Sequence, residues 1–557
     1  MHTPPLNLSS PSPPRRWCLA PKHLLVAVFW GSFFCGLNRL PLQSNEFWGQ
    51  VSYGKWILAN RALPAEDPFS PLAAGMRLFD TAWLSQVIYA TVNSWGGVEA
   101  LSALFAATVV VAHLVLARAF YLPTRNLLVA HLGVLLVAAV SLSRLPEANP
   151  DMFGMLCFAV LLWLLVRDRA AEADTAAGDL RPTRIRWALW LGIPLLLALW
   201  ANLHGSFTCG LLVLVCWFGG AAAEAAWRER TARGVVGDPA VRRWLWLCEL
   251  GLAAACLNPY GVQLVLYNTW FADYRQLREL PAWEPLVLLQ PGGRELVTSL
   301  LVGILVFRFS RKRLPVADLL LLAAFSFVFG GGVRMAWWYA AVFGLAVTPH
   351  LAEMGTCWLN EFLRGRQCHE GVPNRRWFLA DGRRAMSYTV MAAGLLWICF
   401  ALSPAWDSLV RGRPRPPDRL YGGRTPWKLT EHLRENPPQG QVFHPHWWGD
   451  WLIWDGPTGL RPFLMTNLNL VPPKVWTDYR IIRETRSGWD DVLLRYGART
   501  VILDKHRQTT LHRFLRGSDR WELQYEDELS LVFAQAEGRA SSGKSREDAE
   551  QGVSIDE

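Results

Sequence analysis

Long apolar segments alternate with short polar connectors over most of this chain. The first apolar segment covers residues 23–40. Each segment is close to the ~20 residues that an α-helix needs to cross a bilayer. The others lie at 97–119, 125–143, 151–167, 187–203, 205–227, 243–257, 295–309, 315–331, 335–353 and 386–403. The pattern predicts a polytopic α-helical membrane domain over residues 23–403, with about eleven transmembrane helices and a long loop at 41–96.

The composition agrees with a membrane protein. Of the 557 residues, 52% are hydrophobic and only 18% are charged, which is too apolar for a soluble protein of this size. The net charge of +10 comes from Lys and Arg spread over the short connectors. Because these cations do not gather on one face, the charge argues against a nucleic acid partner and is better explained by membrane topology.

The basic residues also predict how the segments are oriented. If residues 1–22 form a cytoplasmic tail, the cytoplasmic connectors are 118–125, 167–186, 228–243, 308–313 and 354–385. All of these are rich in Arg, whereas the alternate connectors are poor in basic residues for their length. Cytoplasmic loops carry this excess of positive charge in membrane proteins. We therefore expect the loop at 41–96 and the chain after residue 403 to lie outside.

Three acids in the external loop are candidates for catalysis. Residues 46–60 have helical periodicity, and a helix lying in the interface would turn Trp48 and Val51 to lipid and keep Glu46 toward water or protein. Asp67 and Asp80 follow in the same loop. Each acid also has a structural explanation: Glu46 at a helix N-terminus, Asp67 in a turn before Pro68, and Asp80 as a helix cap.

Further polar residues fall on the same external side. His204 lies at a tight turn near membrane depth, where an ionisable group needs a partner or a task. Arg334 follows three glycines at the mouth of a helix, where a guanidinium can hold a phosphate. Asp151 follows a proline and is expected to open a helix. The remaining candidates for binding a substrate or a lipid phosphate are Arg144, Asn258 and Glu284.

The character of the chain changes after the last apolar segment. Residues 404–426 form a linker rich in Pro and Arg, and residues 427–535 have the pattern of a small soluble α/β domain. Strands are predicted at QVFHP, RPFLMT, RTVILD, WELQY and LSLVFAQ, and helices at 474–485, 488–496 and 508–516. The polar, acidic residues 536–557 are expected to be disordered.

The stretch HPHWWGDWLIW is the richest patch of this domain. Two histidines in an HxH pair on a strand can bind a metal, but no third ligand is evident. The tryptophans can stack on a sugar or pack the domain against the membrane part. The sequence leaves these alternatives open.

Several motifs resemble one group of proteins. EFWGQVSYGKWI, LPAEDPFS, FDTAWLSQVIY, WANLHGSF with Gly210, LNPYG and the Trp-Glu-Pro at 283–285 are similar to those of a large group of bacterial multi-pass membrane proteins. That group resembles the GT-C glycosyltransferase superfamily, which includes protein mannosyltransferases, oligosaccharyltransferases and lipid A sugar transferases. The similarity covers about residues 23–535 in order.

The resemblance implies a GT-C-like fold in the bacterial cytoplasmic membrane and an inverting transfer of a sugar. The donor would be a polyprenyl-phosphate sugar, and an acid of the first external loop would act as general base or metal ligand. Glu46 stands where the group usually has Asp, and Gln50 where it often has His. A divalent cation is possible, with Glu46 and Asp67 as its candidate ligands.

Two other functions are compatible with the same sequence. One is a membrane protein that keeps the GT-C-like fold but has lost the chemistry, which the replacement of Asp by Glu46 favours. The other is a transporter of a lipid-linked sugar. No nucleotide-binding motif of the form GxxxxGK[ST] occurs, in agreement with a donor carried by a lipid.

Overall fold

The structure is a computed structural model, and it describes residues 21–42, 44–142, 151–176, 183–270, 279, 283–365 and 382–536. The chain divides into two compact units. The helical unit comprises the described residues of Met1–Leu63 and Phe79–Gly422. The α/β unit comprises those of Pro64–Leu78 and Gly423–Glu557.

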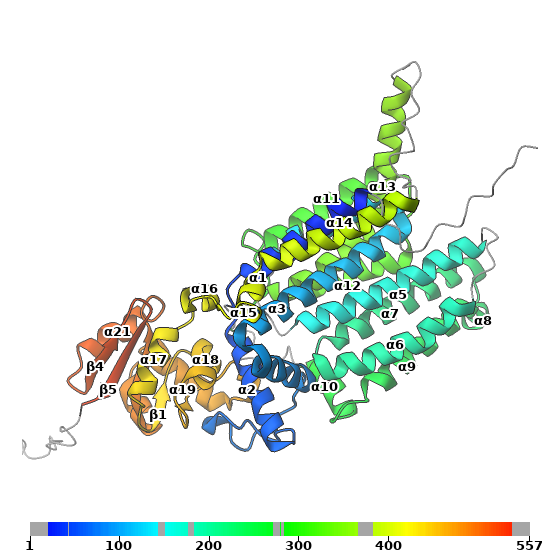
Figure 1. Ribbon diagram of the computed structural model, residues 1–557. Coiled ribbons are helices and arrows are strands. Elements are labelled where there is room, and N and C mark those ends of the chain that lie inside the picture. The colour runs from blue at the N-terminus through cyan, green and yellow to red at the C-terminus, as the bar shows by residue number, and fades with distance from the viewer. Residues whose placement is uncertain are drawn as a thin grey trace, which may run out of the picture. The chain divides into compact units, whose positions relative to one another are not determined.

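The helical unit consists of long helices joined by short connections (Figure 1). They are α1 (Pro21–Arg39), α2 (Asn45–Asn60), α3 (Trp83–Thr124), α4 (Leu127–Val140), α5 (Met152–Ala176), α6 (Thr183–Leu203), α7 (Phe207–Glu229), α8 (Ala232–Gly237), α9 (Pro239–Ala255), α10 (Val262–Trp270), α11 (Gly293–Phe309), α12 (Val316–Gly330), the 3₁₀ turn η4 (Val333–Met335), α13 (Ala336–Gly365), α14 (Gly382–Ala401), α15 (Pro404–Leu409) and α16 (Pro417–Tyr421).

Each of the eleven predicted apolar segments coincides with one of these helices. Two described helices, α3 and α7, are long and apolar enough to cross a membrane by length and composition. Shorter apolar helices lie at Leu127–Val140, Trp187–Leu203, Val316–Gly330 and Ser387–Ala401. The total of eleven spans therefore stays a prediction.

Apolar residues cover both faces of α6, which packs against α5 and α9 (Figure 1). Ile193 and Leu197 are fully buried, whereas Leu191 and Leu195 are 60% and 69% exposed. An exposed leucine stripe at helical spacing is costly in water and favourable in lipid. The outward face of α6 thus has the character of a lipid-facing surface.

The helix predicted at the start of the external loop is α2, but its apolar face is not turned to lipid. Trp48 and Val51 are fully buried, and α2 packs along α3. Gly54 permits this close approach, because a Cβ there would lie 1.9 Å from the backbone oxygen of Gln86. The prediction that Trp48 and Val51 contact lipid is wrong, since the protein itself buries them.

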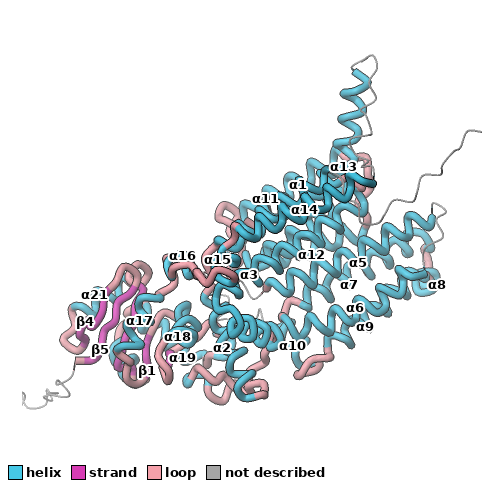
Figure 2. Tube along the Cα trace, viewed as in Figure 1, coloured by secondary structure: helices cyan, strands magenta, loops and turns pink. Residues whose placement is uncertain are grey.

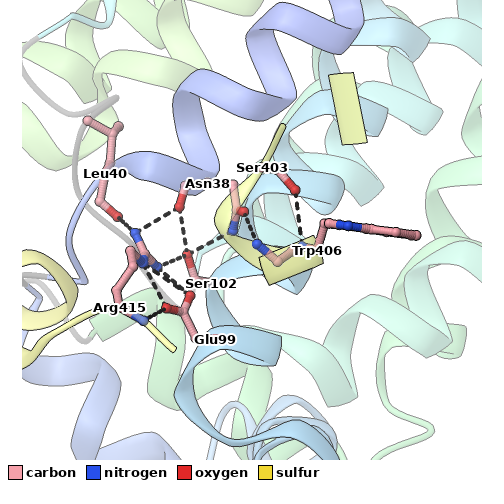
Figure 3. A network of polar contacts seen from close by, with 8 residues as sticks. Asn38, Leu40, Glu99, Ser102, Ser403, Trp406 and Arg415 are labelled. Atoms are coloured by element: carbon pink, nitrogen blue, oxygen red, sulfur yellow. Dashed lines mark hydrogen bonds and ion pairs between the residues drawn. The ribbon is translucent and has the colours of Figure 1, made fainter. Parts of the chain in front are cut away.

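The segment predicted as a linker is ordered up to Gly422 as part of the helical unit. It contains α15 and α16, and Arg415 between them makes a buried ion pair with Glu99 of α3, at 2.7 Å (Figure 3). Arg415 also donates to the backbone oxygen of Asn38 and to the hydroxyl of Ser102. These contacts fasten the segment to α1 and α3.

The α/β unit contains one five-stranded sheet, and all described strands lie in it (Figure 2). The strands are β1 (Gln441–Phe443), β2 (Arg461–Pro462), β3 (Ala498–Asp504), β4 (Trp521–Glu526) and β5 (Ser530–Gln535). Their order is β2-β1-β3-β5-β4; β2, β1 and β3 are parallel, and β5 is antiparallel to β3 and β4.

Helices cover this sheet. They are α17 (Trp427–Glu435), α18 (Gly449–Asp455), α19 (Pro473–Arg483), α20 (Trp489–Arg495) and α21 (Thr509–Arg516), with 3₁₀ turns η1 (Pro71–Ala73), η6 (His446–Trp448) and η7 (Leu468–Leu470). The five predicted strands and the three predicted helices of this region all form, with ends that differ by a few residues.

The histidine and tryptophan patch is divided between core and surface. Trp448 belongs to the hydrophobic core of the α/β unit. His444 is fully buried: its Nδ1–H donates to the carbonyl of Pro445, and its Nε2 accepts from the amide of Phe463. Both ring nitrogens of His444 are therefore engaged, which leaves none to ligate a metal.

Candidate functional site

Arg334 bridges two carboxylates that lie far apart in the sequence. Its guanidinium is 3.1 Å from Oε2 of Glu46 and 3.2 Å from Oδ1 of Asp151. The side chains of Arg334 and Asp151 are 14% and 10% exposed, whereas that of Glu46 is 34% exposed. Glu46 is therefore the more accessible of the two acids.

Short connections between long helices bring these groups together. Glu46 lies in the first turn of α2, where a carboxylate also favours the positive end of the helix dipole. Asp151 directly precedes α5, and Arg334 lies in η4 between α12 and α13. Gly330 ends α12, Gly331 is its C-cap and Gly332 directly precedes η4.

His204 completes the cluster from the turn between α6 and α7. Its Nε2 lies 2.8 Å from Oδ1 of Asp151. Its Nδ1 accepts from the backbone amide of Ser206, at 3.1 Å, and lies 2.8 Å from the Ser206 hydroxyl. Because a backbone amide can only donate, Nδ1 carries no proton. The imidazole is therefore neutral, with its proton on Nε2 and directed at Asp151.

Glycines make room for this arrangement. A Cβ at Gly154 of α5 would lie 2.3 Å from Oγ of Ser206 and 3.3 Å from Nδ1 of His204. A Cβ at Gly210 of α7 would lie 2.6 Å from the ring of Trp200, whose Nε1 donates to the Ser206 hydroxyl. The small residues thus allow α5, α6 and α7 to meet closely behind the His204 turn.

Arg334 is held as a cation. Burial lowers the pKa of Arg334, but the charges of Asp151 and then Glu46 outweigh burial, so that the net effect raises the pKa. The guanidinium also lies over the ring of Trp283, 5.3 Å from its centroid. An arginine held by two acids and an aromatic ring keeps its fork of donors in one orientation.

Asp80 lies in a second polar group in the same unit. It is 4% exposed, and its Oδ1 accepts from the amide of Ala82 at 3.0 Å and from Nε2 of Gln86 at 2.9 Å. Nε2 of Gln86 also donates to Gln50, one helical turn after Glu46. Burial raises the pKa of Asp80 to about 7, against the opposing effect of its two hydrogen bonds.

The structure brings some of the predicted site residues together and leaves others apart. Glu46, His204 and Arg334 meet through Asp151. Asn258 instead forms a turn, in which its Oδ1 accepts from the amide of Tyr260. Glu284 is exposed next to Trp283. Arg144 lies outside the described residues.

Asp67 belongs to the α/β unit. Its Oδ1 accepts from the backbone amides of Phe69, at 2.9 Å, and Ser70, at 3.3 Å. This is the geometry of an Asx turn, which the Asp-Pro sequence also suggested as the structural explanation. A catalytic role for Asp67 stays a prediction.

The donors of the cluster do not fit a divalent cation. Mg²⁺ and Ca²⁺ need six or more oxygen ligands arranged around one point. Glu46 and Asp151 contribute carboxylates, but the guanidinium of Arg334 lies between them and has the charge that the ion would bring. Within the described residues no three His, Cys, Asp or Glu side chains converge as metal ligands.

Sequence reasoning missed the central acid of this cluster. Asp151 was assigned to opening a helix, yet it contacts both His204 and Arg334. The sequence did indicate that Asp151 lies on the external side together with the other polar candidates, and this could have marked it as a site residue. Nothing in the sequence indicated that Gln86 links Asp80 to Gln50.

The comparisons with known proteins concern the fold. No protein-family model matches the chain, and no curated protein matches it significantly. The structure is similar to the crystal structure of the Archaeoglobus fulgidus oligosaccharyltransferase tethered with an acceptor peptide, with a TM-score of 0.52 and 14% identity over 92% of this chain and 74% of that one. It is also similar to the oligosaccharyltransferase AglB from Archaeoglobus fulgidus in complex with an inhibitory peptide and a dolichol-phosphate. There the TM-score is 0.53, with 13% identity over 94% of this chain and 75% of that one.

At such low identity the likeness establishes the fold alone. It confirms the predicted resemblance to the GT-C glycosyltransferase superfamily at the level of architecture: a mostly helical protein like GT-C membrane enzymes, with a small sheet near the C-terminus.

Proposed function

We propose that this chain, with the fold of an oligosaccharyltransferase, is a membrane glycosyltransferase. It transfers a sugar from a polyprenyl-phosphate donor to a hydroxyl acceptor at the external face of the bacterial cytoplasmic membrane. The observation that supports this most directly is the cluster in which Arg334 joins Glu46 to Asp151 and His204. The cluster combines an accessible acid, a fixed cation and an oriented second acid, which are the groups that this transfer requires.

Glu46 is the general base in this proposal. The acceptor hydroxyl attacks the anomeric carbon of the donor sugar and gives its proton to the Glu46 carboxylate. As the new carbon–oxygen bond forms, the bond from the anomeric carbon to the phosphate oxygen breaks, and its electron pair leaves with the lipid phosphate. Attack and departure on opposite faces of the sugar invert the anomeric configuration. The 34% exposure of Glu46 favours it over the more buried Asp151 for this contact.

Arg334 binds the leaving phosphate. A guanidinium fork matches phosphate oxygens and can stabilise the charge that develops on them. In the present arrangement the two acids share the positive charge of Arg334. A phosphate that draws the guanidinium toward itself loosens its pairing with Glu46 and frees that carboxylate to contact the acceptor hydroxyl. Donor binding and activation of the base are thereby coupled.

Asp151 and His204 act as positioning residues. The neutral imidazole directs its Nε2 proton at the same Asp151 oxygen that Arg334 contacts. Two donors on one oxygen fix the carboxylate, and the carboxylate in turn fixes the guanidinium. Asp80 and Asp67 remain further candidates for the chemistry, on the grounds given by the sequence.

A transfer assay on Glu46→Gln tests the proposal. The full chain in membrane vesicles is given a labelled polyprenyl-phosphate sugar, and the label that reaches the acceptor fraction is measured. Loss of a general base lowers rates by roughly 10²–10⁴ fold, and we expect a loss of that size. Glu229→Gln is the matched control, because Glu229 is an exposed acid at the end of α7. Equal transfer by Glu46→Gln and the unchanged protein would remove Glu46 from the mechanism. No transfer by the unchanged protein would favour the non-catalytic alternative.

A further inference from the structure

The segment that follows α14 holds the connection that leads to Glu46. Arg415 is fixed in this segment by its ion pair with Glu99, whose side chain is only 3% exposed (Figure 3). The same guanidinium donates to the backbone oxygens of Asn38, at 2.9 Å, and of Leu40, at 3.4 Å. These carbonyls lie at the end of α1 and just beyond it. Arg415 therefore holds the place where the chain leaves α1 for α2.

A main-chain hydrogen bond joins the same two segments farther along. The amide of Leu42, in the connection between α1 and α2, donates to the carbonyl of Leu420 in α16 at 2.9 Å. Both residues are buried. A hydrogen bond in such surroundings is costly to break, because water does not replace the lost partner. The connection before α2 is thus bonded at two places to residues 415–421, which we call the strap.

Tyr421, the last residue of α16, extends the strap to α2 itself. Its ring packs edge-on against that of Trp48, with centroids 5.6 Å apart and an angle of 70° between the planes. This is a preferred geometry for two aromatic rings. Trp48 lies two residues after Glu46 and is fully buried, whereas Tyr421 is partly exposed. The strap therefore contacts the first turn of the helix that carries Glu46.

An aromatic row runs from this contact past both carboxylates of the Arg334 cluster. Its rings, in spatial order, are those of Tyr421, Trp48, Phe47, Tyr89 and Phe153, with neighbouring centroids between 5.1 Å and 5.6 Å apart. Glu46 directly precedes the third of these residues in sequence, and Asp151 lies two positions before the last. The three middle rings are buried. Because a close-packed interior transmits strain, a change at Tyr421 moves the backbone that carries Glu46.

We propose that Tyr421 is a positioning residue for Glu46, and that the strap keeps the first turn of α2 in the geometry that sugar transfer requires. A general base works only within hydrogen-bond reach of the proton that it takes. Misplacement of a reacting group by about 1 Å can lower a rate by about 10² fold. Tyr421 acts on Glu46 through Trp48 and the backbone of α2. This inference rests on the proposed transfer reaction and extends it to a residue outside the cluster.

Transfer kinetics of Tyr421→Leu in membrane vesicles test this role. We expect kcat to fall about tenfold or more, with little change in KM for the donor, because Arg334 still binds the phosphate. Tyr421→Phe keeps the ring and should keep the rate of the unchanged protein. Trp406→Leu is the matched control and should leave kcat unchanged. Trp406 is also a partly exposed aromatic residue after α14, but its ring packs edge-on against two rings of α14 instead of α2.

Hydrogen exchange followed by mass spectrometry gives a second measurement, which needs no substrate. In the full chain in detergent, Tyr421→Leu should raise the exchange rate of the amides at 49–53 in α2 about twofold to tenfold, the range that loss of one aromatic pair implies. Trp406→Leu should leave this rate unchanged.

Three results would overturn the role of Tyr421. They are an unchanged kcat in Tyr421→Leu, a loss of kcat in Tyr421→Phe or Trp406→Leu as large as that in Tyr421→Leu, and slower transfer by Tyr421→Leu without faster exchange in α2. No transfer by the unchanged protein would instead overturn the proposed function. Exchange in α2 would then still show whether Tyr421 holds that helix, so that the two failures are distinguishable.

Discussion

Nε2 of His204 and the guanidinium of Arg334 meet at a single atom, Oδ1 of Asp151, at 2.8 Å and 3.2 Å. The histidine comes from the turn between α6 and α7, and the arginine from the turn between α12 and α13. Because the histidine is a neutral donor, the cluster holds two carboxylates and one cation. The net charge of the cluster is therefore negative, and Glu46 is the more exposed of its two carboxylates.

His204→Phe should lower the rate of sugar transfer about tenfold or more, with little change in KM for the donor. Asp151 would lose the donor supplied by His204 and with it part of the fixed orientation that Arg334 depends on. Such a bond is worth about 1–3 kcal/mol. The measurement is a comparison of kcat and KM in the transfer assay. His204→Gln, which keeps a donor, should recover part of the rate. A variant that changed only thermal stability would show His204 to be structural.

Gly154→Ala should disturb the site without touching a charged residue. The new methyl group would lie 2.3 Å from Oγ of Ser206, so that Ser206 and the His204 ring must move. We expect a loss of about 1–3 kcal/mol in stability, typical of overpacking, together with slower transfer. Gly192→Ala of α6 is the control, because its nearest side-chain atom is 3.5 Å away. Thermal unfolding and transfer measured on both variants decide the matter, and equal behaviour of the two would contradict the close packing.

Asp80 should make the protein less stable as the pH rises from about 4 to about 7. Burial raises its pKa to about 7 in the folded protein, above the ordinary value of about 3.9 in the unfolded chain. Between these values the folded state binds more protons than the unfolded state, so its stability falls with increasing pH.

Melting temperatures at pH 5 and pH 8 measure this effect. Asp80→Asn should remove the part of the pH dependence that lies in this window and should raise the Tm at pH 8. Asp418→Asn, at an exposed carboxylate in α16, should keep the pH dependence of the unchanged protein. If Asp80→Asn and Asp418→Asn have the same profile, the Asp80 carboxyl is not the group responsible.

Arg415→Ala should destabilise the helical unit by about 3–5 kcal/mol, since it would leave the buried carboxylate of Glu99 unpaired. Arg411→Ala, in the same segment, should change stability by less than about 1 kcal/mol, because its ion pair with Asp407 is exposed. Denaturant unfolding of the two variants provides the comparison. Similar small losses would mean that the segment after α14 is fastened by other contacts.

The sequence alone was enough to predict the local structure of both units. The length of each apolar segment predicted the helices, since a bilayer-length apolar run has few alternatives to a helix. The basic connectors predicted how those helices are oriented. Alternating patterns predicted β1 to β5 of the α/β unit for a similarly local reason. Glu46 was selected as an acid of the external loop, and Arg334 because a guanidinium at the mouth of a helix can hold a phosphate. His204 was selected because an ionisable group near membrane depth needs a partner or a task.

Only the tertiary structure decided which partners those are. That Asp151 receives both His204 and Arg334 depends on how α5, α6 and α12 pack, and no local pattern specifies that packing. Likewise, the apolar face of α2 could pack against either lipid or protein. The close approach of α2 to α3 at Gly54 shows that this face packs against protein. Local periodicity determines which segments become helices, whereas contacts between segments distant in sequence determine where their charged side chains meet.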